Sequence, residues 1–424
     1  MIAGYILSLV FIAGLVGLHY RFNRGILVHW YWPALGVRIL AGLAIGYMYV
    51  VHYGAGDPIT FSTDATTLAN IAREDPTRYL QFLWSGSLLE GLANEQPRVI
   101  FMVKALSLVY LITWNNFWIA SVLLAFFSFA GAWFLVRIIA SRWNSSFPAV
   151  IAFLFWPSIV VWTSGVLKET IATPCLFVMV GCVLMIRENP RRVLAWLGFV
   201  IASWLGWKLK YYNVGVFLSA GLTALAVHYM IGILQIGNRY GQVLLWLVVF
   251  ATLTGTVTFL HPNFNLQALP GVIVDNYRLS VELSEGSGVI LFQGLEPTWA
   301  RIAVYAPKAL FSGLFRPFLW EAGSWLALAG ALENLFLFVM VIWAFVHALR
   351  NPGCREPLLF LAALVVVLIL GVILPLSSPN FGTLSRYRVG YLSLFVFFTL
   401  QGIPGLENRV NEFLRLKLRG VQKN

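Results

Sequence analysis

Charged residues are scarce in this chain of 424 residues: Asp, Glu, Lys and Arg make up 11% of it, whereas 59% is hydrophobic. Soluble globular domains carry about 25% charged residues, so this composition excludes an ordinary soluble domain. The mean hydropathy is +0.80, and the apolar residues fall into runs long enough to cross a bilayer. The sequence therefore predicts an integral membrane protein.

Cysteines and the short motifs of common enzyme classes are lacking as well. The three cysteines, Cys175, Cys182 and Cys354, are too few for a disulfide framework, and the first two share a helix face as packing residues do. The six histidines show no metal-ligand spacing. P-loop, GxSxG and HExxH patterns do not occur, and the use of a metal stays unknown.

Basic residues outnumber acidic ones, and the formal net charge is +12 at pH 7. They form no polar domain of their own, so nucleic-acid binding is not expected. Instead they mark alternate short loops between apolar runs, as cytoplasmic loops do. This alternation predicts an N-terminus outside and a cytoplasmic basic tail, 404–424, in what we expect to be a bacterial cytoplasmic (inner) membrane. The first run lacks a basic start, so it predicts a retained helix rather than a cleaved signal peptide.

The apolar runs predict an all-α, polytopic fold with about eleven transmembrane helices in a single domain, 1–424. The approximate spans are 2–19, 31–53, 116–138, 147–165, 170–186, 193–210, 213–235, 242–261, 324–349, 357–376 and 387–403. The inner loops would then hold Arg21 and Arg24, Arg137 and Arg142, Arg187, Arg191 and Arg192, Arg239, and Arg350 and Arg355.

Two long segments, 54–115 and 262–323, fall on the outer side. Each ends in an apolar run with a few polar residues, 98–113 and 299–315, which we expect to form a helix lying along the membrane interface.

Four residues shape the expectation for these interfacial helices. Pro97 suits a helix start, whereas Pro307 predicts a break or kink in the second helix. Lys104, together with Arg98, is expected to reach lipid headgroups.

Ionisable residues at membrane depth are costly, and they commonly mark a substrate path or a reaction centre. Asp64 follows the second span by about ten residues. A carboxylate just above the membrane can act as general base on an acceptor hydroxyl or hold a divalent metal. Alternatively, Asp64 caps the start of a helix.

Lys168 and Glu169 follow an apolar run with no polar loop around them. The next helix begins at once, so both side chains face either the helix bundle or the lipid surface. The alternative is an anchor pair, with Lys168 at a headgroup and Glu169 at a helix N-terminus.

The sequence FRPFLWE supplies Arg316, Trp320 and Glu321 at the mouth of a span. The planar fork of arginine matches phosphate, and tryptophan offers a flat face for a sugar or lipid. The alternative is a salt bridge of Arg316 with Glu321 below an aromatic belt.

The sequence NFGTLSRYR opens the last span with Arg386 and Arg388. Two positions apart, these side chains share a face only if the backbone is extended, and then they can clamp a diphosphate. Headgroup anchoring is the alternative.

Glu333 lies deeper in a span, where it could be a proton relay or a neutral acid hydrogen-bonded between helices. Arg38 is expected to snorkel to the cytoplasmic surface and has no assigned role.

The order of parts over about residues 40–185 resembles the N-terminal half of GT-C glycosyltransferases. A span leads to an outer loop with Asp64, a helix starting at Pro97, the turn WNNFW (114–118) and two consecutive spans. The resemblance implies a polyprenyl-phosphate sugar as donor and Asp64 as base or metal ligand. Asp64 is followed by Ala65 rather than by a second carboxylate, so a divalent metal is unsupported.

The segments FRPFLWE and NFGTLSRYR resemble segments of bacterial exopolysaccharide and O-antigen assembly proteins, including Wzy-like polymerases. This resemblance implies that the arginines of these segments hold a lipid diphosphate on the outer side. The expected function is glycosyl transfer or glycan polymerisation on a polyprenyl-(di)phosphate-linked substrate at the outer face. The alternatives are a transporter or flippase of a lipid-linked saccharide or of another anionic lipid substrate, and a scaffold in polysaccharide export. The expected partners are membrane lipid, the lipid-linked saccharide and a polysaccharide assembly complex. The candidate catalytic residues are Asp64, Glu169 and Glu321, and the candidate substrate-binding residues are Lys168, Arg316, Trp320, Arg386 and Arg388.

Overall fold

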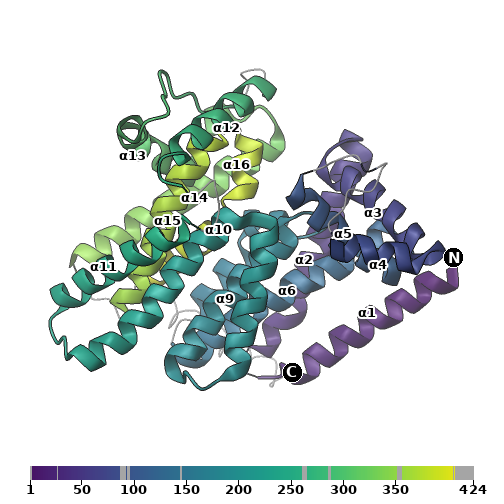
Figure 1. Ribbon diagram of the computed structural model, residues 1–424, viewed down its shortest axis with the longest axis horizontal. Helices are drawn as coiled ribbons and strands as arrows, with labels where there is room; N and C mark the ends of the chain where they lie inside the picture. Colours follow the sequence, from purple (N-terminus) through teal and green to yellow (C-terminus); the bar gives the residue numbers. More distant parts are fainter. Residues whose placement is uncertain are drawn as a thin grey trace, which may run out of the picture. The chain divides into compact units, whose positions relative to one another are not determined.

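The computed structural model describes residues 2–25, 27–85, 92, 96–143, 146–259, 265–284, 288–350, 356–403 and 405. This part of the chain is built from helices, and its only β-type pairing is an isolated bridge between Val289 and Asn380. The predicted all-α fold is therefore confirmed (Figure 1).

Seven helices in the described ranges are long and apolar enough to span a membrane, which indicates a membrane protein. They are α1 (Ile2–Phe22), α2 (Val28–Tyr47) with its π-helical continuation η1 (Met48–Tyr53), α6 (Phe117–Arg142), α9 (Glu169–Glu188), α10 (Val193–Leu234), α14 (Trp325–Arg350) and α15 (Pro357–Ser377). The larger number of spans expected from the sequence stays a prediction.

Helix α10 is 42 residues long but contains one residue with a non-helical backbone, Lys210, at φ −143° and ψ 67°. The two spans predicted as 193–210 and 213–235 therefore form one helix with a break at their boundary. Each half is close to the length that a bilayer requires.

The span predicted as 147–165 is not one continuous helix. Its first part, α7 (Ser146–Val150) and η2 (Ile151–Phe155), ends at Trp156, where ψ is 121°. The short helix α8 (Pro157–Trp162) begins at the next residue. Pro157 accounts for the break, because proline excludes the preceding residue from the helical region and has no N–H to donate.

The chain folds into two compact units. Unit 1 comprises Met1–Arg137, Ile159–Val178 and Val200–Tyr212, and unit 2 comprises Ile138–Ser158, Met179–Phe199 and Asn213–Asn424. The boundaries fall inside α6, α9 and α10, so the expectation of a single transmembrane domain stays a prediction.

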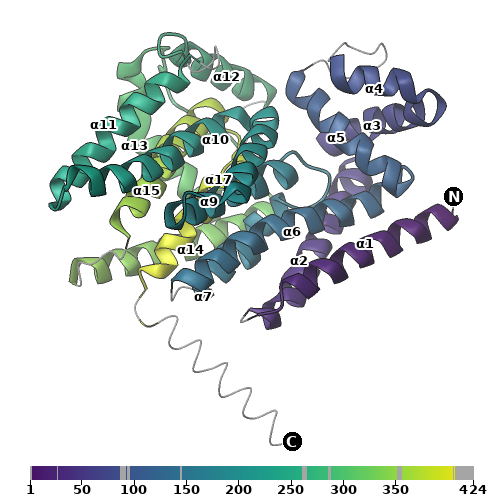
Figure 2. The same ribbon diagram turned by 60° about the horizontal axis from the view of Figure 1, so that its bottom comes forward.

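Within unit 1, the predicted outer segment 54–115 forms α3 (Asp57–Glu74), α4 (Pro76–Ser85) and α5 (Pro97–Thr113), which lie side by side in Figures 1 and 2. Helix α5 starts at Pro97, as predicted. It buries Met102, Leu106 and Tyr110, and the Tyr110 hydroxyl shares a 2.6 Å hydrogen bond with Ser62 of α3.

The two basic residues of α5 have protein partners. Lys104 Nζ donates to the carbonyl oxygens of Phe82 (2.7 Å) and Leu83 (3.3 Å) in α4. The guanidinium of Arg98 lies 5.5 Å from the ring centre of Tyr211. The expectation that Lys104 reaches a lipid headgroup is therefore wrong, because it satisfies carbonyls near the C-terminal end of α4 instead.

Within unit 2, α12 (Leu269–Leu283) and α13 (Trp299–Phe315) pack on α15. The helix is not broken at Pro307, since α13 runs through this residue and its C-terminal half is buried against α15; a kink there stays a prediction. The helices approach closely at Gly313, where a Cβ atom would lie 2.6 Å from Cγ of Pro375. The remaining helices of this unit are α11 (Arg239–Val257), η4 (Leu319–Glu321), α16 (Phe381–Tyr387) and α17 (Val389–Gln401).

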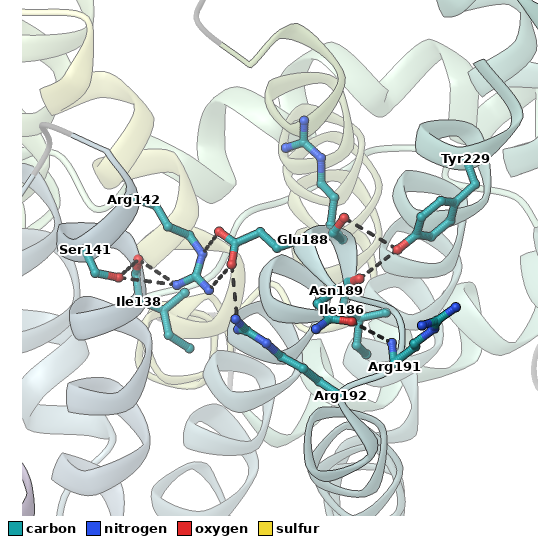
Figure 3. Close-up of polar contacts among 10 residues, drawn as sticks. Ile138, Ser141, Arg142, Ile186, Glu188, Asn189, Arg191, Arg192 and Tyr229 are labelled. Atoms are coloured by element: carbon teal, nitrogen blue, oxygen red, sulfur yellow. Dashed lines mark hydrogen bonds and ion pairs between the residues drawn. The ribbon is translucent and has the colours of Figure 1, made fainter. Parts of the chain in front are cut away.

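Several predicted inner loops meet at one end of unit 2 (Figure 3). Arg142, at the end of α6, forms a two-pronged ion pair with Glu188 at the end of α9, and its Nη2 donates to Oε2 at 2.6 Å. Arg192 lies 3.7 Å from the same carboxylate, and Arg187 pairs with Glu356 at 2.8 Å. These loops thus lie at a common end, as the charge alternation requires. The side of the membrane that this end faces stays a prediction, and the tail from Glu407 lies outside the described residues.

Candidate functional site

The centre of unit 1 contains a buried ion pair between Glu169 and Lys210. Lys210 Nζ donates to Glu169 Oε1 at 2.6 Å, and the two residues are only 4% and 1% exposed, respectively. Glu169 is the first residue of α9, and Lys210 is the residue at which α10 is broken. Removing two charges from water costs several kcal/mol per ion, and the close contact of the opposite charges offsets part of this cost.

Lys168 and Asp64 belong to the same unit as this pair, and Lys168 directly precedes Glu169 in the chain. The ammonium of Lys168 is 5.1 Å from the ring centre of Phe61 on α3, a cation–π contact. Phe61 and Asp64 are three residues apart on α3 and both are buried, so they share the inward face of that helix. We call Asp64, Lys168, Glu169 and Lys210 the charged cluster of unit 1.

The setting of Asp64 differs from both alternatives that the sequence suggested. Helix α3 begins at Asp57, with Gly56 as the residue before it, so Asp64 is neither a loop residue nor a helix cap. It lies in the second turn of α3, inside unit 1. A buried carboxylate on a rigid helix is held in a more fixed position than a loop residue would be.

Arg38 was expected to snorkel to the cytoplasmic surface, and this was wrong. It lies in the middle of α2 and is fully buried. Its Nη1 donates to Ser128 Oγ and to Thr163 Oγ1, both at 2.6 Å. An arginine eleven residues into a twenty-residue helix is too far from either end to snorkel, and this depth was the signal available in the sequence.

Arg38 also fixes the segment that carries Lys168 and Glu169. Thr163 starts the irregular stretch before Lys168, and α2 approaches this stretch closely at Gly42. A Cβ atom on Gly42 would lie 3.0 Å from the backbone nitrogen of Gly165, which itself has φ +78°. Helix α2 thus positions the 163–168 stretch through one arginine and one glycine contact.

In unit 2, Arg316 and Glu321 form the salt bridge that was the alternative reading of FRPFLWE. Arg316 Nε donates to Glu321 Oε2 at 3.0 Å and Nη2 donates to Oε1, while Phe318 N donates to Oε2 at 2.9 Å. Partial burial acts to raise the pKa of the Glu321 carboxyl. The hydrogen bonds from Arg316 and Phe318 outweigh it, so this pKa lies below its usual value. Trp320 is 81% exposed and stacks on Phe318 with ring centres 4.9 Å apart.

Arg386 and Arg388 have different surroundings. Helix α16 reaches Tyr387, and Arg388 has φ −72° and ψ −14°, so the extended backbone that would align the two side chains is absent. Arg388 is buried and donates to Asn334 Oδ1 at 2.7 Å and to the carbonyls of Leu314 and Arg316 at 3.3 Å each. Arg386 is half-buried beside the ring of Tyr387. Arg388 therefore contacts the backbone of Arg316, and the diphosphate clamp stays a prediction for Arg316 and Arg386.

Glu333 was expected to be either a proton relay or an acid hydrogen-bonded between helices, and the structure shows hydrogen bonds between helices. Its carboxylate accepts from Trp156 Nε1 (2.6 Å), Ser158 Oγ (2.5 Å) and Ser158 N (2.8 Å). Glu333 of α14 thereby caps the first turn of α8.

The candidate residues are divided between the units: Asp64, Lys168 and Glu169 belong to unit 1, and Arg316, Trp320, Glu321, Arg386 and Arg388 belong to unit 2. Among the described residues, no group of three or more His, Cys, Asp and Glu side chains could hold a metal ion. Cys175 and Cys182 are buried in α9 as free thiols, and Cys354 lies outside the described residues.

No protein-family model, no curated protein sequence and no solved structure matches the chain. The interpretation of the site therefore rests on its own residues.

Proposed function

We propose that the protein catalyses glycosyl transfer or glycan polymerisation on a polyprenyl-(di)phosphate-linked substrate in the assembly of a cell-surface polysaccharide. The observation that carries this proposal is the charged cluster of unit 1. It combines the buried Glu169–Lys210 pair at a break in α10 with Asp64, which is buried on the face of α3 that Lys168 contacts through Phe61. Buried ionisable groups in a membrane protein are expensive to maintain, and a reaction on an anionic lipid substrate gives a reason to keep them.

Asp64 is the proposed general base. The acceptor hydroxyl gives its proton to the Asp64 carboxylate while its oxygen bonds to the anomeric carbon of the donor sugar. The bond from that carbon to the phosphate oxygen breaks, and the leaving phosphate keeps the electron pair. The ammonium of Lys168, which is half-exposed, is suited to stabilise the negative charge that develops on the phosphate.

The candidate residues of unit 2 are assigned a binding role within that unit by itself. The half-buried guanidinium groups of Arg316 and Arg386 offer charge to a diphosphate, and the exposed face of Trp320 offers a surface for a sugar ring. Arg388 is assigned a positioning role, because its hydrogen bonds hold the backbone next to Arg316. We place this activity at the outer face of a bacterial inner membrane, with about eleven spans, the N-terminus outside and the basic tail in the cytoplasm.

The test of this function is the variant Asp64→Asn, read out as accumulation of the lipid-linked intermediate in cells and as product formation by the purified protein. Loss of a base costs about 10²- to 10⁴-fold in rate, so product should be nearly abolished at an unchanged protein level. Glu74→Gln, which removes an exposed carboxylate from the same helix, is the matched control and should retain activity. Normal product from Asp64→Asn, with loss in Glu169→Gln or Glu321→Gln at an unchanged level of folded protein, would move the base to one of those two residues.

The break in α10 also favours a second candidate function, a transporter or flippase for a lipid-linked saccharide. Broken helices with charged residues at the break are a recurring feature of transport sites. Vesicles containing the purified protein separate the two functions. Movement of a labelled lipid-linked saccharide across the bilayer without a new glycosidic bond indicates transport, and a longer glycan indicates the transferase.

A further inference from the structure

An apolar hollow lies within unit 2, and none of its lining residues is polar or charged. The lining side chains come from α6, η2, α9, α10, α15 and α17, and they include Trp143, Phe153, Phe217 and Phe397. Because the indole of Trp143 is the only hydrogen-bonding side chain among these lining residues, they hold water poorly, and the hollow suits a hydrocarbon chain.

Two of the lining helices carry an arginine one turn beyond the hollow. On α6, the lining residue Ile139 precedes Arg142 by three positions, and on α9 the lining residue Leu184 precedes Arg187 by three positions. Residues three apart lie on the same face of a helix, so each arginine continues the stripe that lines the hollow.

Two further lining helices reach the same end. On α15, the lining residue Leu359 is three positions after Glu356, and on α10 the lining residue Phe199 is seven positions, or two turns, after Arg192. Four lining helices thus lead from the hollow to one polar group of residues. We call it the arginine cluster, and it consists of Arg142, Arg187, Glu188, Arg191, Arg192 and Glu356.

The arginine cluster is positively charged, since four arginines face two glutamates. Arg142 is occupied by Glu188, and Arg187 by Glu356. Arg191 and Arg192 are exposed, and Arg192 is only loosely associated with Glu188 at 3.7 Å (Figure 3). Two guanidinium groups at the arginine cluster are therefore accessible to an anion.

We propose that unit 2 binds one anionic phospholipid, with an acyl chain in the apolar hollow and the phosphate at Arg191 and Arg192. Basic pockets between transmembrane helices commonly hold anionic headgroups, because each arginine adds to the attraction. The inference concerns unit 2 alone and does not depend on the proposed reaction.

The headgroup part is tested by native mass spectrometry of the full chain titrated with dioleoyl phosphatidylglycerol or dioleoyl phosphatidylcholine. The wild type should bind phosphatidylglycerol more tightly, and Arg191→Gln/Arg192→Gln should weaken this binding at least about fivefold while leaving phosphatidylcholine unchanged. Arg239→Gln, on a helix that does not line the hollow, is the control and should bind as the wild type does. Equal affinities for the two lipids, or an unchanged double variant, would overturn the proposal.

The acyl-chain part is tested by filling the hollow. Ala363→Phe, on α15, should abolish the retained lipid adduct, whereas Ala329→Phe, at an exposed position of α14, should keep it. If Ala363→Phe is not recovered as folded protein, Ala220→Leu fills the same hollow from α10. An adduct of unchanged affinity in a folded hollow-filling variant would contradict the proposal.

Discussion

Lys210 Nζ lies 2.6 Å from Glu169 Oε1 in unit 1, and both side chains are almost completely shielded from solvent. Removing one partner of a buried pair leaves an uncompensated charge, which costs about 3–5 kcal/mol. Glu169→Gln and Lys210→Met should therefore each lower the unfolding temperature in detergent sharply, and the double variant should recover part of the loss. Glu296→Gln removes the exposed pair of Glu296 with Arg301 (3.7 Å) and should change stability by less than about 0.5 kcal/mol. Equal effects in the buried and the exposed pair would contradict the assignment.

We expect Arg386 to contribute to substrate binding and Arg388 to contribute to the stability of the fold. Arg388→Gln leaves the carbonyls of Leu314 and Arg316 without their donor, at a cost of about 1–3 kcal/mol per unsatisfied group. Arg386→Gln should leave the unfolding temperature nearly unchanged and raise KM for the lipid-linked substrate. The two measurements are thermal unfolding and product formation at varied substrate concentration. A stability loss in both variants, or in neither, would remove the distinction.

Arg38 should act on product formation through the 163–168 stretch that it holds. Arg38→Lys keeps a charge but loses the fork that reaches Ser128 and Thr163 together, so activity should fall several-fold. Arg38→Met should reduce both activity and stability, because two buried hydroxyls lose their donor. Arg21→Met, at an exposed position of α1, is the control. Full activity in a folded Arg38→Met protein would show that α2 does not position this stretch.

The ion pair of Glu321 with Arg316 should contribute to stability in a pH-dependent manner. The pKa of the Glu321 carboxyl is lowered in the folded protein, so its stabilising effect is fully present above the usual glutamate pKa of about 4.3. It is lost as pH falls through the lower folded-state value. The difference in unfolding temperature between wild type and Glu321→Gln should therefore be constant near neutral pH and shrink in acid. Glu282→Gln, which removes an exposed carboxylate of α12, is the control. The difference in unfolding temperature between wild type and this variant should not shrink in acid in the same way.

The orientation of the chain can be tested by labelling single cysteines in intact cells. After replacement of the native cysteines, Thr77→Cys on α4 and Gln293→Cys in the second long segment should react with a membrane-impermeant reagent. Asn189→Cys, beside the arginine cluster, should react only after the membrane is made permeable. Labelling of Asn189→Cys in intact cells would reverse the predicted sides.

The sequence predicted elements that depend on local chemistry and missed those that depend on distant partners. The start of α5 at Pro97 and the division near Lys210 follow from proline geometry and from a polar interruption of an apolar run. The orientation of the Arg388 side chain depends instead on hydrogen-bond acceptors from residues 314, 316 and 334, which no local sequence pattern reveals.

The candidate site shows the same limit. Asp64, Lys168 and Glu169 were singled out because charge is rare in an apolar chain, and all three belong to unit 1. Lys210 was not among the candidate site residues, because its pairing with Glu169 joins residues 41 positions apart. Arg38 was dismissed by its assumed distance from the membrane surface, although Ser128 and Thr163 hold it in the interior.

The contact of Glu333 with Ser158 has a consequence for how the protein is made. The carboxylate that accepts from Ser158 N is 175 residues further along the chain. Ribosomes add about 5–20 residues per second, so roughly nine to thirty-five seconds separate the synthesis of the two residues. During this interval the start of α8 lacks its final acceptor, and an uncapped N–H in lipid is costly. Nascent chains that stop before α14 should therefore hold residues 146–162 loosely, exposed to the insertion machinery and to membrane proteases, until Glu333 arrives.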